Sequence, residues 1–76
     1  MKEILETLIK GLVENKDAVT VTEKEDGKTT VFEVKVSDSD MGKVIGRQGK
    51  VAKSIRTIMK SISGKEHKKV VVEFID

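Results

Sequence analysis

Cysteine is absent from this 76-residue chain, and His67 is its one histidine. Disulfide bonds are therefore excluded, and a lone histidine cannot assemble the cysteine and histidine ligands of a structural zinc site. A chain of this length buries a core that is only just large enough to hold a fold together. The fold must therefore rest on side-chain packing, without a covalent or metal staple.

Long apolar runs are also absent, and the first residues enter a charged amphipathic pattern. This pattern predicts neither a signal peptide nor a membrane span. No internal repeat, linker or low-complexity segment divides the sequence. We therefore expect one domain over residues 1–76, located in the cytoplasm.

Aromatic rings are scarce, with Phe32 and Phe74 but no tyrosine or tryptophan. Both phenylalanines alternate with valines in strand-like segments, which favours core packing for their rings. RNA recognition motifs and oligonucleotide-binding barrels read single strands by stacking bases on aromatic side chains. The composition therefore argues against those two classes of nucleic-acid-binding fold.

Groups that could perform catalysis are equally scarce. His67 lies in a polar segment with no nucleophile beside it, so a solvated loop histidine is the expected role. Asp38 and Asp40 alternate with serines just before a predicted helix, where capping of free amides is favoured over paired-carboxylate chemistry. Neither a Walker A loop nor a dinucleotide-binding glycine motif is present. We expect no enzyme activity, no cofactor and no bound metal ion.

Acidic side chains are missing from residues 41–65, which carry seven basic ones. Residues 1–40 hold six basic and ten acidic side chains, and residues 66–76 hold two and three, so the modest net charge of +2 hides a strong asymmetry. A solvated helix face is one interpretation of such a run. Solvated faces, however, gain from interleaved Glu and Lys, whereas a stretch of one sign repels itself. The asymmetry therefore favours an anionic partner.

Hydrophobic periodicity predicts the elements of the first half of the chain. Apolar residues recur on one helical face over residues 2–14, which indicates an amphipathic helix. The period then changes to two, which predicts one strand beginning near Ala18 and a second over residues 30–36. Asp26-Gly27 between them is typical of a type I′ hairpin turn.

The second half alternates between helices and turns. Residues 37–40 form a polar loop before a short helix over residues 41–45, and a glycine turn follows at once. From Gly49 a second helix places apolar residues on one face and four basic residues, Lys50, Lys53, Arg56 and Lys60, on the other. Ser63-Gly64 ends it, with the glycine suited to a left-handed conformation. A strand over residues 70–75 closes the chain.

These elements predict an α+β fold of two layers, with the order α-β-β-α-α-β. The apolar sides would be buried between a three-stranded sheet and three helices on one of its faces. A helical crossover leads to the last strand, so the right-handed connection rule places this strand beside the second one.

The glycine turn lies within Gly42–Lys50, where Gly46 and Gly49 bracket Arg47 and Gln48. Glycine permits close backbone approach and positive φ angles. A helix that begins at Gly49 presents unpaired amides and the positive end of its dipole, which together favour an anion. Arg47, Lys50 and Lys53 would add formal charge to this site.

These residues carry a resemblance to a known family. Val44-Ile45-Gly46-Arg47-Gln48-Gly49, placed between two helices, resembles the GXXG core of a KH domain, and the helix-strand-strand lead-in is similar to the type II arrangement. The match spans the whole chain. It is most similar to KhpA, a family of small stand-alone bacterial KH proteins, in which a similar Ile-Gly-Arg-Gln-Gly precedes a Lys-rich helix that contains Ile-Arg-Thr, as residues 52–57 do here.

The resemblance implies that the turn clamps the backbone of single-stranded RNA. The amides of Arg47, Gln48 and Gly49 would meet phosphate, and bases would lie on an apolar strip formed with Val44, Ile45 and the second strand. The implied role is that of a post-transcriptional regulator or RNA chaperone. The implied RNA-binding residues are Lys43, Val44, Ile45, Gly46, Arg47, Gln48, Gly49, Lys50 and Lys53.

A second hypothesis assigns the chain to a different class. KhpA-like proteins are associated with homodimers and with a larger partner of the Jag (KhpB) type. The domain would then be mainly a dimerisation module, with the helix pair around the GXXG turn as its interface. The seven basic residues of the segment 41–65 would repel those of a second copy if the glycine turns met, which disfavours a dimer through the turn. Acidic residues of a partner could face this segment instead, namely Glu23, Glu25 and Asp26.

Overall fold

A computed structural model describes residues 2–64 and 69–75 of the chain. The polar connection around His67 lies outside the described residues, so its predicted role stays a prediction. Three short 3-10 turns, Lys16–Ala18, Asp38–Asp40 and Arg47–Gly49, join the main elements. These elements are α1 (Lys2–Lys10), β1 (Thr20–Asp26), β2 (Thr29–Lys35), α2 (Met41–Ile45), α3 (Lys50–Ser63) and β3 (Lys69–Ile75).

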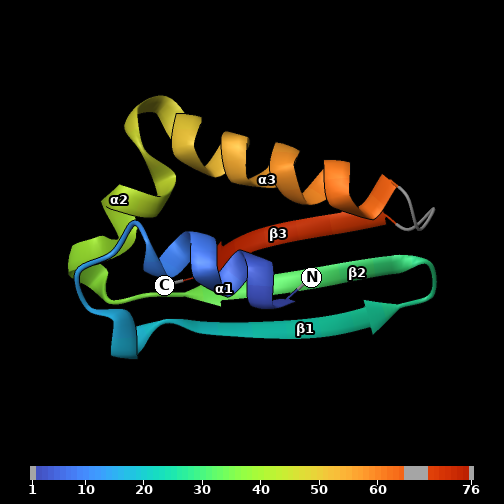
Figure 1. Cartoon of the computed structure of the whole chain (residues 1–76), viewed down its shortest axis with the longest axis horizontal. Helices are drawn as coiled ribbons and strands as arrows, with labels where there is room; N and C mark the ends of the chain where they lie inside the picture. Colours follow the sequence, from blue (N-terminus) through green and yellow to red (C-terminus); the bar gives the residue numbers. More distant parts are fainter. Residues whose placement is uncertain (1, 65–68, 76) are drawn as a thin grey trace.

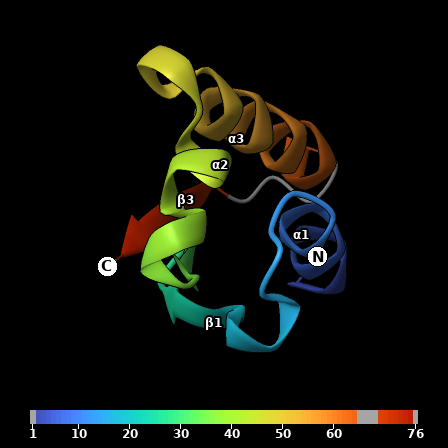
Figure 2. The same cartoon turned by 90° about the vertical axis from the view of Figure 1, so that its left-hand side faces the viewer.

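The three strands form one mixed sheet in the order β1-β2-β3. β1 pairs antiparallel with β2, and β2 pairs parallel with β3 in a register that sets Phe32 opposite Val72. The helices lie over one face of this sheet (Figure 1), and the end-on view in Figure 2 shows α1 and α3 side by side above it. The predicted two-layer α+β fold and the position of the last strand beside the second are therefore confirmed.

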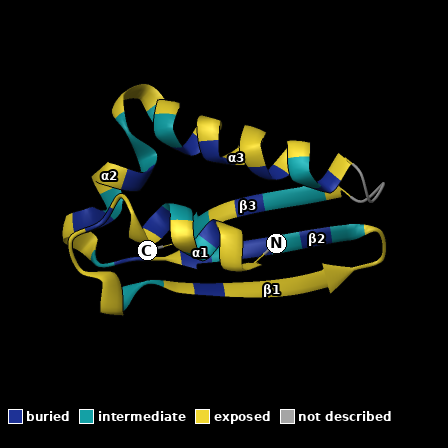
Figure 3. Ribbon diagram, viewed as in Figure 1, coloured by how far each residue is buried: buried dark blue, intermediate teal, exposed yellow. Residues whose placement is uncertain are grey.

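The core lies between the sheet and the helices. Most of its buried residues lie on the predicted apolar faces, and on α3 the dark bands of Figure 3 face inward. Ile4, Leu12 and Ile58, which the periodicity also placed on these faces, are exposed instead. The Phe32 ring is fully buried, which confirms its predicted role in packing. The buried apolar residues are Leu5, Ile9, Val13, Val21, Phe32, Val34, Val36, Val44, Ala52, Ile55, Met59 and Val72.

Two turns differ from the sequence-based prediction. The hairpin loop is Gly27-Lys28, since Asp26 pairs with Thr29 as the last pair of the ladder. Gly27 alone takes a positive φ, of 63°, in this loop, which is the pattern of a type II′ turn with glycine first. Gly64 ends α3 with φ of −56°, so its predicted left-handed conformation is wrong.

The first helix is shorter than predicted. α1 ends at Lys10, and the chain continues as a tightened turn in which the Leu12 amide donates to the Ile9 carbonyl at 3.0 Å. Gly11 lies at this point, and glycine is a poor helix former because it loses much backbone freedom on folding. Val13 still reaches the core, so the apolar periodicity continues past the end of the helix itself.

Asp40 is a buried carboxylate that joins the segment before α2 to the segment after α1. Its oxygens accept hydrogen bonds from the backbone amides of Glu14 and Asn15, at 3.2 and 3.0 Å, and from the Ser37 hydroxyl at 2.9 Å. The predicted capping role is therefore wrong for Asp40, because its side chain bonds across the fold rather than to the amides of α2. These contacts fix α2, and with it the glycine turn, against the rest of the domain.

The same contacts make Asp40 sensitive to acid. The Asn15 amide, opposed by burial and aided by the Glu14 amide and Ser37, lowers the pKa of Asp40 from 3.8 to about 2. The folded-state pKa thus lies below the unfolded one, so the carboxylate stabilises the fold fully above pH 3.8 and loses this effect as the pH falls toward 2.

We predict that Asp40→Asn lowers the urea midpoint at about pH 5, and that the gap to the wild-type chain closes as the pH falls to about 2.5. The amide cannot ionise, so the variant lacks the component of acid sensitivity that this carboxylate supplies. Asp38→Asn, at an exposed position, is the matched control and should leave the midpoint nearly unchanged. A gap that stays constant over this pH range would contradict the assignment.

Candidate nucleic-acid interface

The glycine turn projects from one end of the molecule, opposite the β1-β2 hairpin (Figure 1). Three of its residues have positive φ angles: Gly46 (φ 77°, ψ 174°), Gln48 (φ 58°, ψ 25°) and Gly49 (φ 73°, ψ 15°). The Gly46 conformation is essentially open to glycine alone, and the other two are left-handed. The turn therefore reverses the chain between α2 and α3 with a backbone that most residues could not follow.

Gly46 is also held by close packing. A Cβ atom at this position would lie 2.9 Å from the Val51 backbone nitrogen and closer still to the Val51 side chain. At Gly49 a Cβ atom would meet only open space among the described residues. Gly46 thus permits the close approach of the turn to the first residues of α3. At position 49 glycine is favoured only because the backbone takes a positive φ angle there.

The amides of the turn differ in availability. The Gly49 amide donates to the Gly46 carbonyl at 3.2 Å, and the Gly46 amide to the Gly42 carbonyl at 2.9 Å. The amides of Arg47 and Gln48 donate to no other described residue. These two amides, rather than the three that the sequence predicted, are open to an anion.

Four basic side chains, on the turn and along α3, have no acidic partner among the described residues. Arg47, Lys50, Lys53 and Lys60 are exposed, and none forms an ion pair with another described residue. Uncompensated charges of one sign repel each other and attract an anion from solution. The structure thus brings Arg47, Lys50 and Lys53 together with the turn, as the sequence predicted.

Lys43 differs from these cations. Its Nζ lies 2.9 Å from Glu14 Oε1 and 3.4 Å from Asp40 Oδ1. The hydrogen bond to Glu14 is the main reason that the pKa of Lys43 is raised. Lys43 is therefore compensated by the protein itself. The role of Lys43 in binding RNA stays a prediction. The two ion pairs argue against it, because they already neutralise the charge that would attract a phosphate.

The apolar residues before the turn lie mostly inside the domain. Val44 is fully buried in the core, and Ile45 is half-buried. Val44 can therefore support the turn from beneath, but its side chain offers no surface to a base. The second strand, expected to help form the apolar strip, is the central strand of the sheet, and its inward face is buried.

A groove between α3 and β3 has both basic and apolar residues in its lining. It has a volume of about 350 Å³ and is lined by Lys53, Arg56, Thr57 and Lys60 on one side and by Val70, Val71 and Val72 on the other. Arg56 spans it, with Nε donating to the Val72 carbonyl at 3.1 Å. Sequence reasoning placed the basic residues on one side of α3 but did not place β3 beside them. The predicted helical crossover from the basic helix to the last strand was the signal that could have done so.

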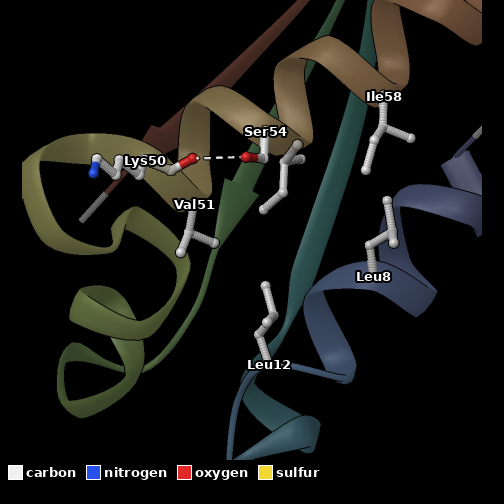
Figure 4. Close-up of a pocket in the computed structure, with 7 residues that line it drawn as sticks. Leu8, Leu12, Lys50, Val51, Ser54 and Ile58 are labelled. Atoms are coloured by element: carbon white, nitrogen blue, oxygen red, sulfur yellow. Dashed lines mark hydrogen bonds between the residues drawn. The ribbon is translucent and has the colours of Figure 1, made fainter.

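A second groove lies on the other flank of α3. It has a volume of about 320 Å³ and opens between α1 and α3, where Leu8, Leu12, Val51 and Ile58 point toward one another (Figure 4). Leu12 is 40% exposed and Ile58 43% exposed. Nearby on α1, Ile4 is 44% exposed. α3 therefore carries a basic groove on one flank and an apolar groove on the other.

Within residues 2–64 and 69–75, no three histidine, cysteine, aspartate or glutamate side chains gather where a metal ion could be held. No helix in the described part of the chain has the length and apolar character needed to cross a membrane.

The geometry is that of a type II KH domain, and the chain belongs to the KhpA/KhpB KH-domain family, whose model matches residues 2–74. The chain is 51% identical over 75 residues to the RNA-binding protein KhpA of Clostridium acetobutylicum, covering 99% of this chain and 100% of that protein. The RNA-binding protein KhpA of Aquifex aeolicus is 47% identical over 76 residues, with 100% of this chain and 96% of that protein covered.

A solved structure shares the fold. Superposition on a crystal structure of Aquifex aeolicus Era gives a TM-score of 0.65 at 18% sequence identity, and covers 96% of this chain and 28% of that one. At this level of identity the match supports the fold alone. It places the same architecture inside a longer protein.

The two glycines of the turn should respond differently to alanine. Gly49→Ala introduces a left-handed alanine and should cost about 1–2 kcal/mol of unfolding free energy. Gly46→Ala adds to an unfavourable backbone conformation the collision with Val51, so we predict a larger loss. Urea denaturation of both variants measures the difference, and equal losses would contradict the packing argument.

Proposed function

We propose that this protein binds single-stranded RNA by holding its phosphate backbone at the Gly46-Arg47-Gln48-Gly49 turn. The Arg47 and Gln48 amides approach phosphate oxygens, and Arg47, Lys50 and Lys53 supply positive charge. From the turn, the strand continues along the groove between α3 and β3. The backbone amides of the turn are held in place by the fold before the RNA arrives, while the cationic side chains are exposed.

The observation that carries this proposal is the position of two open amides beside cations that have no acidic partner among the described residues. Amides aimed at solvent beside uncompensated cations favour an anion. The groove that leads away from the turn has basic residues along one wall and valines along the other. A polynucleotide needs both, since its backbone is charged and its bases have apolar faces.

The names of the relatives support the same proposal, because several proteins at 37–51% identity are called RNA-binding protein KhpA. The family description pairs KhpA with KhpB. We therefore place the protein in the bacterial cytoplasm as a post-transcriptional regulator or RNA chaperone that acts with a KH-containing partner. The groove is short and would hold only a few nucleotides. A partner domain that binds the same RNA would raise the overall affinity, because its binding would take place within one complex.

Self-association is a second candidate function, and the apolar groove between α1 and α3 favours it. The exposed Leu12 and Ile58 side chains lie there, away from the basic flank of α3. A dimer seam along this groove would bury apolar surface, and it would come close to the turn at Lys50, which also lines the groove. The two candidate functions would therefore use mostly different side chains, with Lys50 common to both.

For RNA binding, we predict that Arg47→Asp combined with Gln48→Asp weakens affinity at least about tenfold, or about 1.4 kcal/mol. The substitutions oppose phosphate with negative charge, while aspartate tolerates the left-handed conformation at position 48. Fluorescence anisotropy with a labelled single-stranded RNA measures the change.

The matched control is Lys10→Gln combined with Lys28→Asp, which changes the net charge by the same amount at exposed positions away from the turn. Binding by the wild-type chain should also weaken roughly 20- to 50-fold between 50 and 200 mM salt if about three or four phosphates are held. Equal losses in the two double variants, or an affinity insensitive to salt, would contradict phosphate clamping at the turn.

For self-association, we predict that light scattering finds a dimer of the wild-type chain at high concentration and that Ile58→Asp converts it to a monomer. The introduced carboxylate would have to be buried in the dimer seam without a partner, which disfavours the dimer. Ile75→Asp, at a sheet position with similar exposure, is the control and should leave the mass unchanged. A wild-type monomer at every concentration tested would remove this candidate.

A further inference from the structure

Arg56 stands apart from the other cations of α3. Its Nε donates to the Val72 carbonyl at 3.1 Å, and its guanidinium carbon lies 5.6 Å from the centre of the Phe74 ring. Arg47, Lys50, Lys53 and Lys60 have no such contact with the described part of the chain. The guanidinium of Arg56 is thus fixed across the groove, whereas the lysine side chains extend into solvent.

We propose that Arg56 determines base preference, by favouring at this point of the groove a base that presents two adjacent hydrogen-bond acceptors. This inference rests on the proposed RNA binding and names a specificity within it. The acceptor pair belongs to guanine, through O6 and N7, or to cytosine, through N3 and O2. Adenine and uracil offer no such pair on the corresponding edges, because an N–H donor adjoins each acceptor.

The state of the guanidinium supports this assignment. With Nε committed to Val72, the two terminal nitrogens remain as donors, and neither bonds to another described residue. These nitrogens form a planar fork whose parallel N–H groups match two neighbouring acceptors. Because the carbonyl and the ring already hold the fork, little side-chain freedom is left to lose when a base binds.

The surroundings of Arg56 favour a base over a phosphate. The facing wall of the groove is formed by Val70, Val71 and Val72. The Val72 side chain is buried in the core, so the half-buried side chains of Val70 and Val71 are the ones that suit the flat apolar face of a base. Lys53 and Lys60 flank Arg56 on the same helix, and both carry charge that no described acid compensates. A phosphate therefore gains more from the lysines, while Arg56, engaged with a carbonyl oxygen and an aromatic ring, is directed into the groove.

The test measures a ratio of affinities. Eight-residue uridine RNAs that carry one central guanosine, cytidine or adenosine are titrated against the full chain by fluorescence anisotropy. We expect the guanosine or the cytidine RNA to bind at least about fivefold more tightly than the adenosine RNA. Inosine and 7-deazaguanosine distinguish the two sources of the acceptor pair, since inosine keeps O6 and N7 and 7-deazaguanosine lacks N7.

Arg56→Lys keeps the charge but removes the fork, so the ratio should fall to about one. Lys53→Gln is the matched control, because the loss of a phosphate contact weakens all three RNAs by the same factor and preserves the ratio. If Arg56→Lys fails to fold, the comparison of inosine, 7-deazaguanosine and cytidine RNAs with the wild-type chain still decides the matter.

The outcomes separate this inference from the proposed function. Wild-type binding without preference among the bases, or a preference that persists in Arg56→Lys, overturns the role of Arg56 and leaves RNA binding in place. A loss in Arg56→Lys that is equal for all RNAs assigns Arg56 to phosphate and also overturns it. Failure of the wild-type chain to bind any of the RNAs at low salt overturns the proposed function itself.

Discussion

The contact between Gly46 and the start of α3 is the constraint on which the candidate site depends. Since the backbone at Gly46 lies against Val51, the chain reverses within residues 46–49 and α3 turns back over the sheet. The positive φ angles that follow leave the Arg47 and Gln48 amides without partners among the described residues. Asp40 secures the other end of α2 through the backbone amides of the segment that follows α1. The turn is thus held at both ends, and its open amides are a product of that restraint.

The position of α3 separates a basic groove from an apolar groove. One flank faces β3 and carries the basic groove, and the other faces α1 and carries the apolar groove. An RNA strand and a protein partner would compete if they used the same side of the helix. On this fold Lys53 and Ile58 belong to different grooves, although Lys50 lines the apolar groove and also follows the turn directly. The sequence alone left the two functions as alternatives, and on this fold the two proposed sites would share few side chains.

The fold could be predicted from the sequence where a repeating pattern extends over several turns or pairs, as in α3 and β2. Prediction was wrong where one residue had to choose among local conformations, as at Gly27 and Gly64. The same holds for the candidate site, where the cations of α3 could be predicted from their helical spacing but the contacts of Asp40 and Arg56 could not. The Asp40 contacts join residues 25 and 26 positions apart, and the Arg56 contact joins residues 16 apart. Such pairs depend on tertiary packing, which no local pattern in the sequence encodes.

The uncompensated charge of α3 has a consequence for stability. A domain of this size has a small margin of stability, and repulsion among Lys50, Lys53 and Lys60 reduces it. The chain contains acidic residues, but Asp40 and Glu14 pair with Lys43 behind the turn and leave the α3 lysines open. A bound polyanion would supply the missing negative charge to the folded state alone, because the unfolded chain does not hold these cations together. By linkage, RNA bound at this surface would stabilise the folded state. In the free protein the same cations lower the stability through their mutual repulsion.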